Sequence, residues 1–202
     1  MVVTPAPRSG ENAPLSAEKF LSLLDGGKFS DGHVELLHGE TILKISQGPL
    51  YVHALMLVQR ALQAYTGQGR VLLAQSSVYL SPDSVAEPDV AIVTEAPVRE
   101  EREVRGSDVH LVVEISDSSL RKDREVKSAL YATAGIPEYW IVNPVARQVE
   151  IRLKPSGSYS ETAVLGDGDI SPWFSQAKVS VASFFSLPQR RLSFESKRRI
   201  SR

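Results

Sequence analysis

The chain has 202 residues, of which 42% are hydrophobic and 23% charged, and its formal net charge is −1. These values are typical of a globular protein with one sizeable core. Cysteine is absent, which excludes a disulfide framework, a thiolate zinc site and a cysteine nucleophile. No apolar run reaches the roughly 20 residues that cross a bilayer, and the N-terminus lacks the apolar segment of a signal peptide, so we expect a cytoplasmic protein.

The N-terminal part of the chain predicts a tail, a short helix and a hairpin. Residues 1–14 are rich in proline and small polar groups, which favours disorder. Ser16 is a typical N-cap for the helix that follows. The segments 33–37 and 41–46 flank a turn and predict a β-hairpin. Glu35 lies in the first strand of this hairpin, where an exposed strand carboxylate is the alternative to a functional one.

A second helix is predicted over residues 51–66, with apolar side chains at helical spacing: Leu55, Val58, Leu62 and Tyr65. His53 lies in its first turn, where a lone histidine is more often structural than functional. The four histidines of the chain show no tight ligand spacing, which argues against a zinc enzyme. Residues 71–74 and 77–80 are predicted as two short β runs, with one bent strand as the alternative, and Gln75 lies between them.

The stretch from residue 87 to residue 143 organises the rest of the chain. It predicts a strand, an exposed charged loop, a second strand, a helix and a third strand, over residues 90–93, 95–107, 109–115, 120–133 and 138–143. Asp89 opens the first strand and Glu114 lies near the end of the second. A carboxylate is rarely buried unless it is paired or coordinated. The alternative is that Glu114 already turns out to solvent.

Lys127 lies on the predicted helix, one residue off its apolar stripe and four residues after Asp123. A surface ion pair with Asp123 is therefore the alternative to a role in chemistry. The functional interpretation needs the first turns of the helix to pack beside the end of the strand that carries Glu114. Lys127 would then share a site with Asp89 and Glu114.

Two carboxylates and one amine at such junctions suit a divalent-metal site for phosphodiester hydrolysis. Asp89 and Glu114 would supply hard oxygen ligands to Mg²⁺ or Mn²⁺, with the backbone carbonyl of Ile115 as a third. The metal would lower the pKa of its bound water, and Lys127 would orient that water or stabilise charge on phosphorus. The near-neutral net charge weighs mildly against this hypothesis, because a nucleic-acid binder usually carries a basic surplus.

The C-terminal part predicts a hairpin, an aromatic core segment and a basic tail. The segments 148–153 and 159–164 alternate as a hairpin. The residues expected to pack the end of the domain are Trp173, Phe174, Val179, Val181, Phe184 and Phe185. From Arg190 onward the tail is basic, and it is as well suited to a solvated end as to phosphate contacts. P-loop, GxGxxG and GxSxG motifs are absent.

The run EPDVAIV … LVVEISDSSLRKDREVKSALYATAGIPEYWIVNP closely resembles the Uma2 family, the former DUF820 group, of restriction-endonuclease-like proteins. The resemblance covers roughly residues 31–155. The segment VELLHGETI resembles the family's Glu-containing ELIDGE hairpin, with HGE in place of DGE as a turn variation. His53 matches the histidine of the family's first core helix.

The resemblance implies a mixed α+β and α/β fold, with the αβββαβ core of PD-(D/E)xK nucleases and β-hairpin additions at both ends. That superfamily uses Asp followed by Glu-x-Lys. Asp89 and Glu114 match, but position 116 is a serine, and the Uma2 group is understood to move the lysine to the following helix, which by position is Lys127. The resemblance also implies Glu35 and His53 near the site, with Gln75 as a weaker candidate.

These observations predict a disordered tail over 1–14, a single domain over 15–187 and a basic tail over 188–202. The expected protein is an endodeoxyribonuclease that uses Mg²⁺ or Mn²⁺, has DNA as its partner, makes no membrane contact and forms a possible homodimer. One alternative is a non-catalytic domain of the same fold that binds nucleic acid or a protein partner. Another is a scaffold or oligomerisation domain with a vestigial site.

Overall fold

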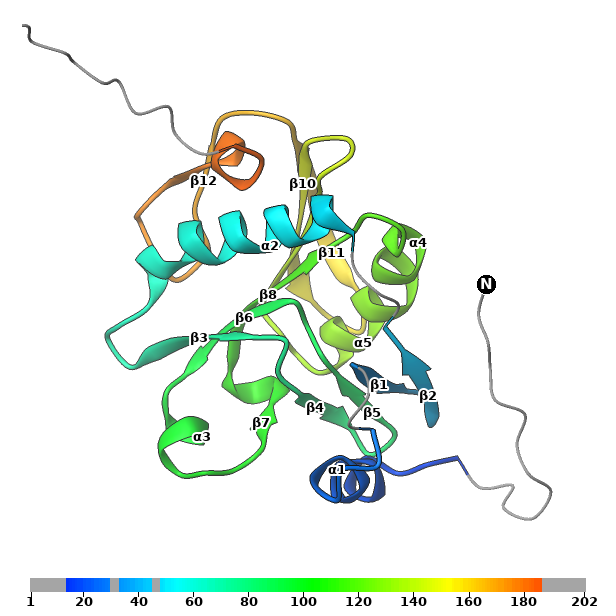
Figure 1. Cartoon of the computed structure of the whole chain (residues 1–202). Coiled ribbons are helices and arrows are strands. Elements are labelled where there is room, and N and C mark those ends of the chain that lie inside the picture. Colours follow the sequence, from blue (N-terminus) through cyan, green and yellow to red (C-terminus); the bar gives the residue numbers. More distant parts are fainter. Residues whose placement is uncertain (1–13, 30–32, 45–47, 187–202) are drawn as a thin grey trace, which may run out of the picture.

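The computed structural model describes residues 14–29, 33–44 and 48–186, and their strands form two larger sheets and one short one (Figure 1). The six strands of the first sheet are, in spatial order, β11 (Tyr159–Leu165), β10 (Gln148–Pro155), β9 (Glu138–Asn143), β8 (Val109–Ile115), β6 (Val90–Thr94) and β3 (Arg70–Ala74). Strands β8 and β9 are parallel, and the other neighbours are antiparallel. The expected mixed α/β fold is confirmed.

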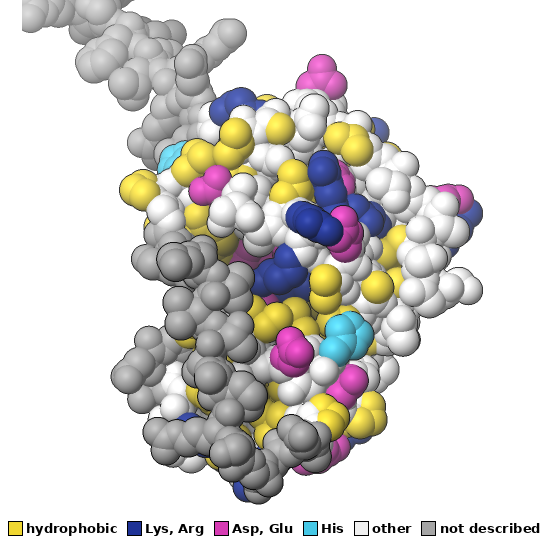
Figure 2. Space-filling view, turned by 90° about the vertical axis from the view of Figure 1, so that its right-hand side faces the viewer, with side chains coloured by type: hydrophobic (Ala, Val, Ile, Leu, Met, Phe, Trp, Pro, Cys, Tyr) yellow, Lys and Arg dark blue, Asp and Glu magenta, His cyan; other side chains and the backbone are white. Residues whose placement is uncertain are grey.

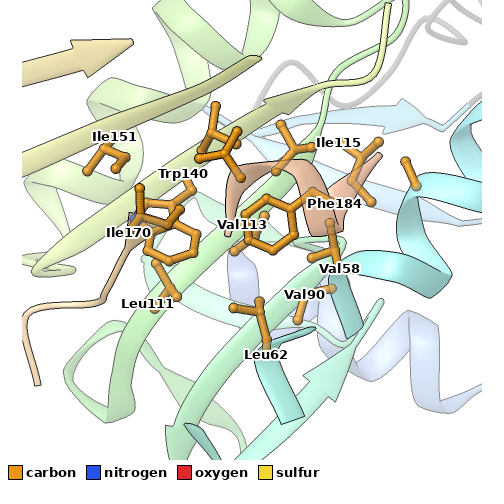
Figure 3. Packing of buried hydrophobic residues seen from close by; sticks show 14 of the residues in the cluster. Val58, Leu62, Val90, Leu111, Val113, Ile115, Trp140, Ile151, Ile170 and Phe184 are labelled. Atoms are coloured by element: carbon orange, nitrogen blue, oxygen red, sulfur yellow. The ribbon is translucent and has the colours of Figure 1, made fainter. Parts of the chain in front are cut away.

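Helix α2 (Pro49–Leu62) packs on one face of this sheet, and the 3-10 helix η1 (Gln63–Tyr65) extends it. Its buried side chains meet every second residue of the central strands, because strand side chains alternate between faces. A 3-10 helix near the C-terminus, η4 (Val181–Phe184), completes this layer. The shared core is shown in Figure 3 and includes Val58, Leu62, Val90, Leu111, Val113, Ile115, Trp140 and Phe184.

A continuous helical segment packs on the opposite face and connects the parallel strands β8 and β9. It consists of α4 (Leu120–Lys122), the π-helical turn η3 (Asp123–Lys127) and α5 (Ser128–Thr133). Leu130 and Tyr131 pack in one cluster with Ala91, Val112 and Ile141, the strand residues that alternate with those facing α2. The central strands are therefore covered on both faces, which explains why they are almost continuously apolar.

The second sheet has five strands in the order β2 (Glu40–Leu43), β1 (Val34–Leu37), β5 (Ser84–Ala86), β4 (Val78–Ser81) and β7 (Val104–Arg105). Helix α1 (Ala17–Asp25) packs on it through Phe20, which contacts the cluster that holds Leu36. Leu37 belongs instead to a cluster of the larger sheet. Strand β1 is thus buried on both faces, and the alternation places Glu35 on the same side as Leu37.

Several predicted elements are confirmed. Ser16 caps α1 by accepting a hydrogen bond from the Lys19 N–H at 3.3 Å. The hairpins β1–β2 and β10–β11, the helix α2 and the strands β6, β8 and β9 lie where the sequence places them. Of the two predicted tails, residues 1–13 and 187–202 lie outside the described part of the chain.

The two short β runs predicted over residues 71–74 and 77–80 are confirmed as β3 and β4, but they do not form one bent strand. Ala74 pairs with Val90 in the larger sheet, whereas Val78 pairs with Ala86 in the smaller one. Gln75 lies between them with a φ of 49°, in the left-handed region, so the chain turns sharply and changes sheet. The segment that carries Gln75 therefore joins the two sheets.

The exposed loop predicted over residues 95–107 is also partly wrong. It contains the short helix α3 (Ala96–Arg99), strand β7, which pairs in parallel with β4, and the start of the 3-10 helix η2 (Gly106–Asp108). Trp173, which we expected in the core, is 57% exposed, although Val181, Phe184 and Phe185 are buried as predicted. A short two-stranded sheet, β12 (Asp169–Ile170) with β13 (Val179–Ser180), ends the fold. No helix in the described residues is long and apolar enough to span a bilayer.

Candidate metal and phosphodiester site

Asp89 and Glu114 lie side by side at the ends of two neighbouring strands. Val90 of β6 pairs with Val113 of β8, and the next step of this antiparallel register brings Asp89 opposite Glu114. Directly opposed residues point to the same face of a sheet. Each of the two side chains belongs to a residue that is only 2% exposed. The structure therefore brings both predicted acids together in a buried position.

Both oxygens of the Asp89 carboxylate are held by the protein. The Tyr51 hydroxyl of α2 donates to Oδ1 at 2.6 Å, and the backbone N–H of Ile115 donates to Oδ2 at 2.7 Å. Lys44, which follows β2, donates from Nζ to Oδ1 at 3.0 Å. These contacts come from both sheets and from α2, so they fix the position of Asp89 from several directions.

Lys127 joins two further carboxylates in the interior. Its Nζ lies 2.8 Å from Glu114 Oε1 and 2.5 Å from Glu35 Oε1, and the residue is 1% exposed. Glu35 is fully buried, and it also accepts a hydrogen bond from the Glu87 N–H at 3.0 Å. The Tyr131 hydroxyl donates to Glu114 Oε1 at 2.6 Å. The alternatives in which Glu35, Glu114 or Lys127 faces solvent are wrong.

The π-helical turn η3 explains why Lys127 points inward from a position beside the apolar stripe. A π turn holds one residue more than the α-helical spacing allows, so it shifts the side chains that follow it around the helix axis. Lys127 is the last residue of this turn, and both it and Asp123 are buried. An α-helical pattern read from the sequence cannot show this shift.

Ser116 occupies the position where the PD-(D/E)xK motif has its lysine. Its hydroxyl donates to Asp123 Oδ2 at 2.6 Å, and the Ser119 hydroxyl donates to the same oxygen at 2.5 Å. The Asp123 carboxylate thereby connects the end of β8 to the start of the helix that carries Lys127. Ser116 thus stabilises the local structure through its hydrogen bond to Asp123, and it supplies no positive charge to the site.

Burial and charge shift the pKa values of the cluster in opposite directions. Burial, offset in part by Lys127 and reinforced by Asp89, raises the pKa of the Glu114 carboxyl to about 8. Burial alone would lower the pKa of Lys127, but the carboxylates of Glu114 and Glu35 outweigh it and hold that pKa well above its usual value. Burial also acts on Glu35, yet Lys127 and Lys122 hold the pKa of its carboxyl below the ordinary value.

The remaining predicted site residues are placed less centrally. Gln75 lies next to the cluster: its backbone N–H donates to the Asp89 carbonyl at 3.2 Å, and its Nε2 lies 3.5 Å from the Tyr51 hydroxyl. His53 is exposed on α2 and makes no hydrogen bond or ion pair with the described members of the cluster. Ile115 takes part through its backbone N–H, and a role for its carbonyl remains a prediction.

Sequence reasoning did not single out three residues of this cluster: Lys44, Tyr51 and Tyr131. Each contacts a predicted acid from another element of the fold, and no short motif marks it. Lys122 is a fourth addition, with Nζ 3.5 Å from Glu35 Oε2. A polar side chain on the buried face of a predicted helix is the one available signal, and Tyr51 and Tyr131 both have it.

The donor set suits a hard divalent cation, although the acids do not form a ready-made cage. Among the residues that the structure describes, no group of three or more His, Cys, Asp and Glu side chains is arranged to hold a metal ion. The buried Glu35 Oε2 has no hydrogen-bond partner within that same set. The two adjacent carboxylates of Asp89 and Glu114 match the one or two protein carboxylates that Mg²⁺ takes in many sites, while Glu35 is paired with Lys122 and Lys127. The residues fit such an ion.

Comparison with known proteins finds a solved structure of similar fold and a family to which the sequence belongs. The fold resembles the crystal structure of a "putative nuclease belonging to DUF820" from Anabaena variabilis ATCC 29413, with a TM-score of 0.63. The two chains are 15% identical, and the match covers 85% of this chain and 98% of the other. No curated protein matches the chain. Residues 17–176 match the Uma2 family, described as "putative restriction endonuclease", and the chain belongs to that family.

Proposed function

We propose that the protein is a metal-dependent endonuclease that hydrolyses DNA phosphodiester bonds on a restriction endonuclease-like αβββαβ core. The observation that supports this most strongly is the meeting of Asp89, Glu114 and Lys127 in one buried cluster. The order α2, β3, β6, β8, α4–α5, β9 supports the core assignment, with β4, β5 and β7 inserted into the second sheet.

The two acids would hold Mg²⁺ or Mn²⁺, with the Ile115 carbonyl as a third oxygen. When bound, such an ion supplies Lewis-acid stabilisation and a water of lowered pKa. The Tyr51 hydroxyl donates a hydrogen bond to Asp89 Oδ1 and so fixes the position of the Asp89 carboxylate. The Lys127 ammonium would orient the attacking water or stabilise the charge that develops on the phosphate. Glu35 keeps this ammonium in place by pairing with it at 2.5 Å.

His53 and Gln75 complete the proposed site in outer roles. The Gln75 side chain lies 3.5 Å from the Tyr51 hydroxyl, which in turn donates to Asp89, so Gln75 would position Asp89 through Tyr51. The exposed His53 is suited to a contact with the nucleic acid rather than with the ion. Both assignments rest on the family resemblance together with their places on α2 and at the junction of the two sheets.

Exposed arginines beside the site, Arg121 paired with Glu125 and Arg124 paired with Glu150, support DNA as the substrate if phosphates replace these glutamates as their partners. Figure 2 views the side on which α4 and β2 lie in Figure 1, and Lys and Arg side chains gather near the middle of this face. Arg121 and Arg124 are exposed on the α4–η3 segment, and Lys122 between them reaches Glu35. Because phosphate contacts are supplied largely by such side chains, a net charge of −1 does not prevent local binding.

Plasmid nicking tests the proposed function. Supercoiled DNA should be nicked in Mg²⁺ or Mn²⁺, remain intact in EDTA, and remain intact with Asp89→Asn or Glu114→Gln. Asp167→Asn changes an exposed carboxylate away from the cluster and serves as the matched control, with activity retained. Robust cleavage by either site variant would remove those acids from the mechanism.

Charge balance in the cluster favours a second candidate function, binding of nucleic acid or a protein partner without catalysis. The three buried carboxylates Glu35, Asp89 and Glu114 are matched by the ammonium groups of Lys44, Lys122 and Lys127. A balanced cluster is stable without an added ion. This candidate predicts salt-dependent DNA binding with no cleavage in any divalent metal, and little loss of binding in Lys127→Ala.

A further inference from the structure

Lys44 is the one cation in direct contact with Asp89 among the described residues. Its Nζ lies 3.0 Å from Asp89 Oδ1 and donates to the Glu87 carbonyl at 2.8 Å. The other two contacts to the Asp89 carboxylate come from the neutral groups of Tyr51 and Ile115. The Lys44 ammonium therefore occupies the space beside Asp89 Oδ1 that a metal ion bound to this oxygen would need.

The balance of charge makes this contact an obstacle to a divalent cation. A 2+ ion at Asp89 with the ammonium still in place would bring like charges within a few ångströms of each other in a partly buried site, where repulsion is strong. Lys127 cannot withdraw easily, because it is 1% exposed and bridges two carboxylates. The Lys44 side chain is 11% exposed and lies nearer to solvent.

The carboxylate of Glu87 is close enough to serve as an alternative partner for the Lys44 ammonium. Glu87 Oε1 lies 3.9 Å from Nζ, so a small movement exchanges Asp89 for Glu87 as the partner. Glu87 also lies 2.6 Å from His33 Nδ1, and its side chain is 11% exposed. Lys44 can therefore leave Asp89 without losing all of its negative partners.

We propose that Lys44 is an internal competitor for the metal: its ammonium holds the cation position at Asp89 in the metal-free protein and moves to Glu87 when a divalent ion binds. The proposal rests on the proposed function only in that Asp89 is a metal ligand. It assigns Lys44 a role in setting metal affinity. Removal of the ammonium should raise that affinity.

Calorimetric titration with Mn²⁺ alone, without DNA, tests this proposal. Lys44→Gln should bind Mn²⁺ about tenfold or more tightly than the unchanged protein, since a factor of ten is a modest effect for a charge in contact with a ligand. Lys44→Arg keeps the positive charge and should bind Mn²⁺ no more tightly than the unchanged protein. Lys154→Gln removes an exposed lysine that pairs with Glu161, and it should leave the affinity unchanged.

A crystal of the unchanged protein soaked in Mn²⁺ gives a readout that does not depend on variants. Lys44 Nζ should then lie beyond hydrogen-bond distance of Asp89 Oδ1 and near Glu87. Equal Mn²⁺ affinity in the unchanged protein and Lys44→Gln would overturn the proposal while leaving the metal site intact. Absence of Mn²⁺ binding in both would overturn the metal site itself, and the proposal with it.

Discussion

Replacement of Lys127 by methionine tests whether the buried cluster depends on its bridging ammonium. Methionine fills similar space but carries no charge, so Glu114 and Glu35 lose the partner that now lies 2.8 Å and 2.5 Å from them. Breaking a buried ion pair by removing one partner costs about 3–5 kcal/mol, because the remaining charge stays buried. We therefore expect the free energy of unfolding to fall by about that amount.

The loss should depend on pH, and the sign follows from the carboxyl groups. Without Lys127, burial raises the folded-state pKa of the Glu114 carboxyl further above its unfolded value, and the Glu35 carboxyl loses the strongest of the charges that lower its pKa. Such groups are protonated and tolerated at low pH, and they destabilise the fold as the pH rises through the folded-state pKa. Lys127→Met should thus lose more stability at pH 8 than at pH 5.5.

Urea unfolding followed by circular dichroism at the two pH values measures both effects. Lys154→Met, at an exposed lysine paired with Glu161, should unfold like the unchanged protein at either pH. Adding Glu35→Gln to Lys127→Met should recover part of the loss. A loss below about 1 kcal/mol, or one that grows toward low pH, would refute the account of a cluster held by the Lys127 ammonium.

Three other predictions concern the same cluster and its surroundings. If Glu114 is a metal ligand as proposed, protons compete with the ion for its carboxyl, whose pKa is raised to about 8. Mn²⁺ affinity should then rise with pH up to that value and level off above it, as titrations at several pH values would show. Tyr131→Phe should cost about 1.5–3 kcal/mol in urea unfolding, because the Glu114 carboxylate loses its hydroxyl donor at 2.6 Å. Gly106→Ala should cost about 1–3 kcal/mol, because the new Cβ would lie 2.9 Å from the Ala134 carbonyl oxygen. Gly48→Ala, whose new Cβ would have none of the described residues within 4 Å, should change stability little.

The parts of the site that depend on strand order could be predicted from the sequence. Asp89 and Glu114 each stand at the end of an apolar strand, and a carboxylate there is informative because the strand itself is buried. Once β6 and β8 pair, the register alone brings the two acids opposite each other. The N-cap at Ser16 and the two hairpins were similarly accessible, because local residue preferences determine them.

The contacts that cross between sheets could not be predicted from residue patterns. Glu35 is buried because β1 has the larger sheet on one side and α1 on the other, and nothing in the hairpin sequence shows this. Lys44 and Tyr51 reach Asp89 across 45 and 38 positions of the chain. The family resemblance, rather than periodicity, is what indicated Glu35 as a site residue, whereas Lys127 is already indicated by its place on the helix that follows Glu114.

The wide turn between Asp123 and Lys127 has a consequence for insertions and deletions in related chains. Loss of one residue there would let the helix continue in regular α form from α4 into α5. Backbone bonding would improve, but the amine would rotate out of reach of both acids. A relative shortened by that single position would have no cation between its two buried glutamates, so we expect it to be less stable despite the more regular helix.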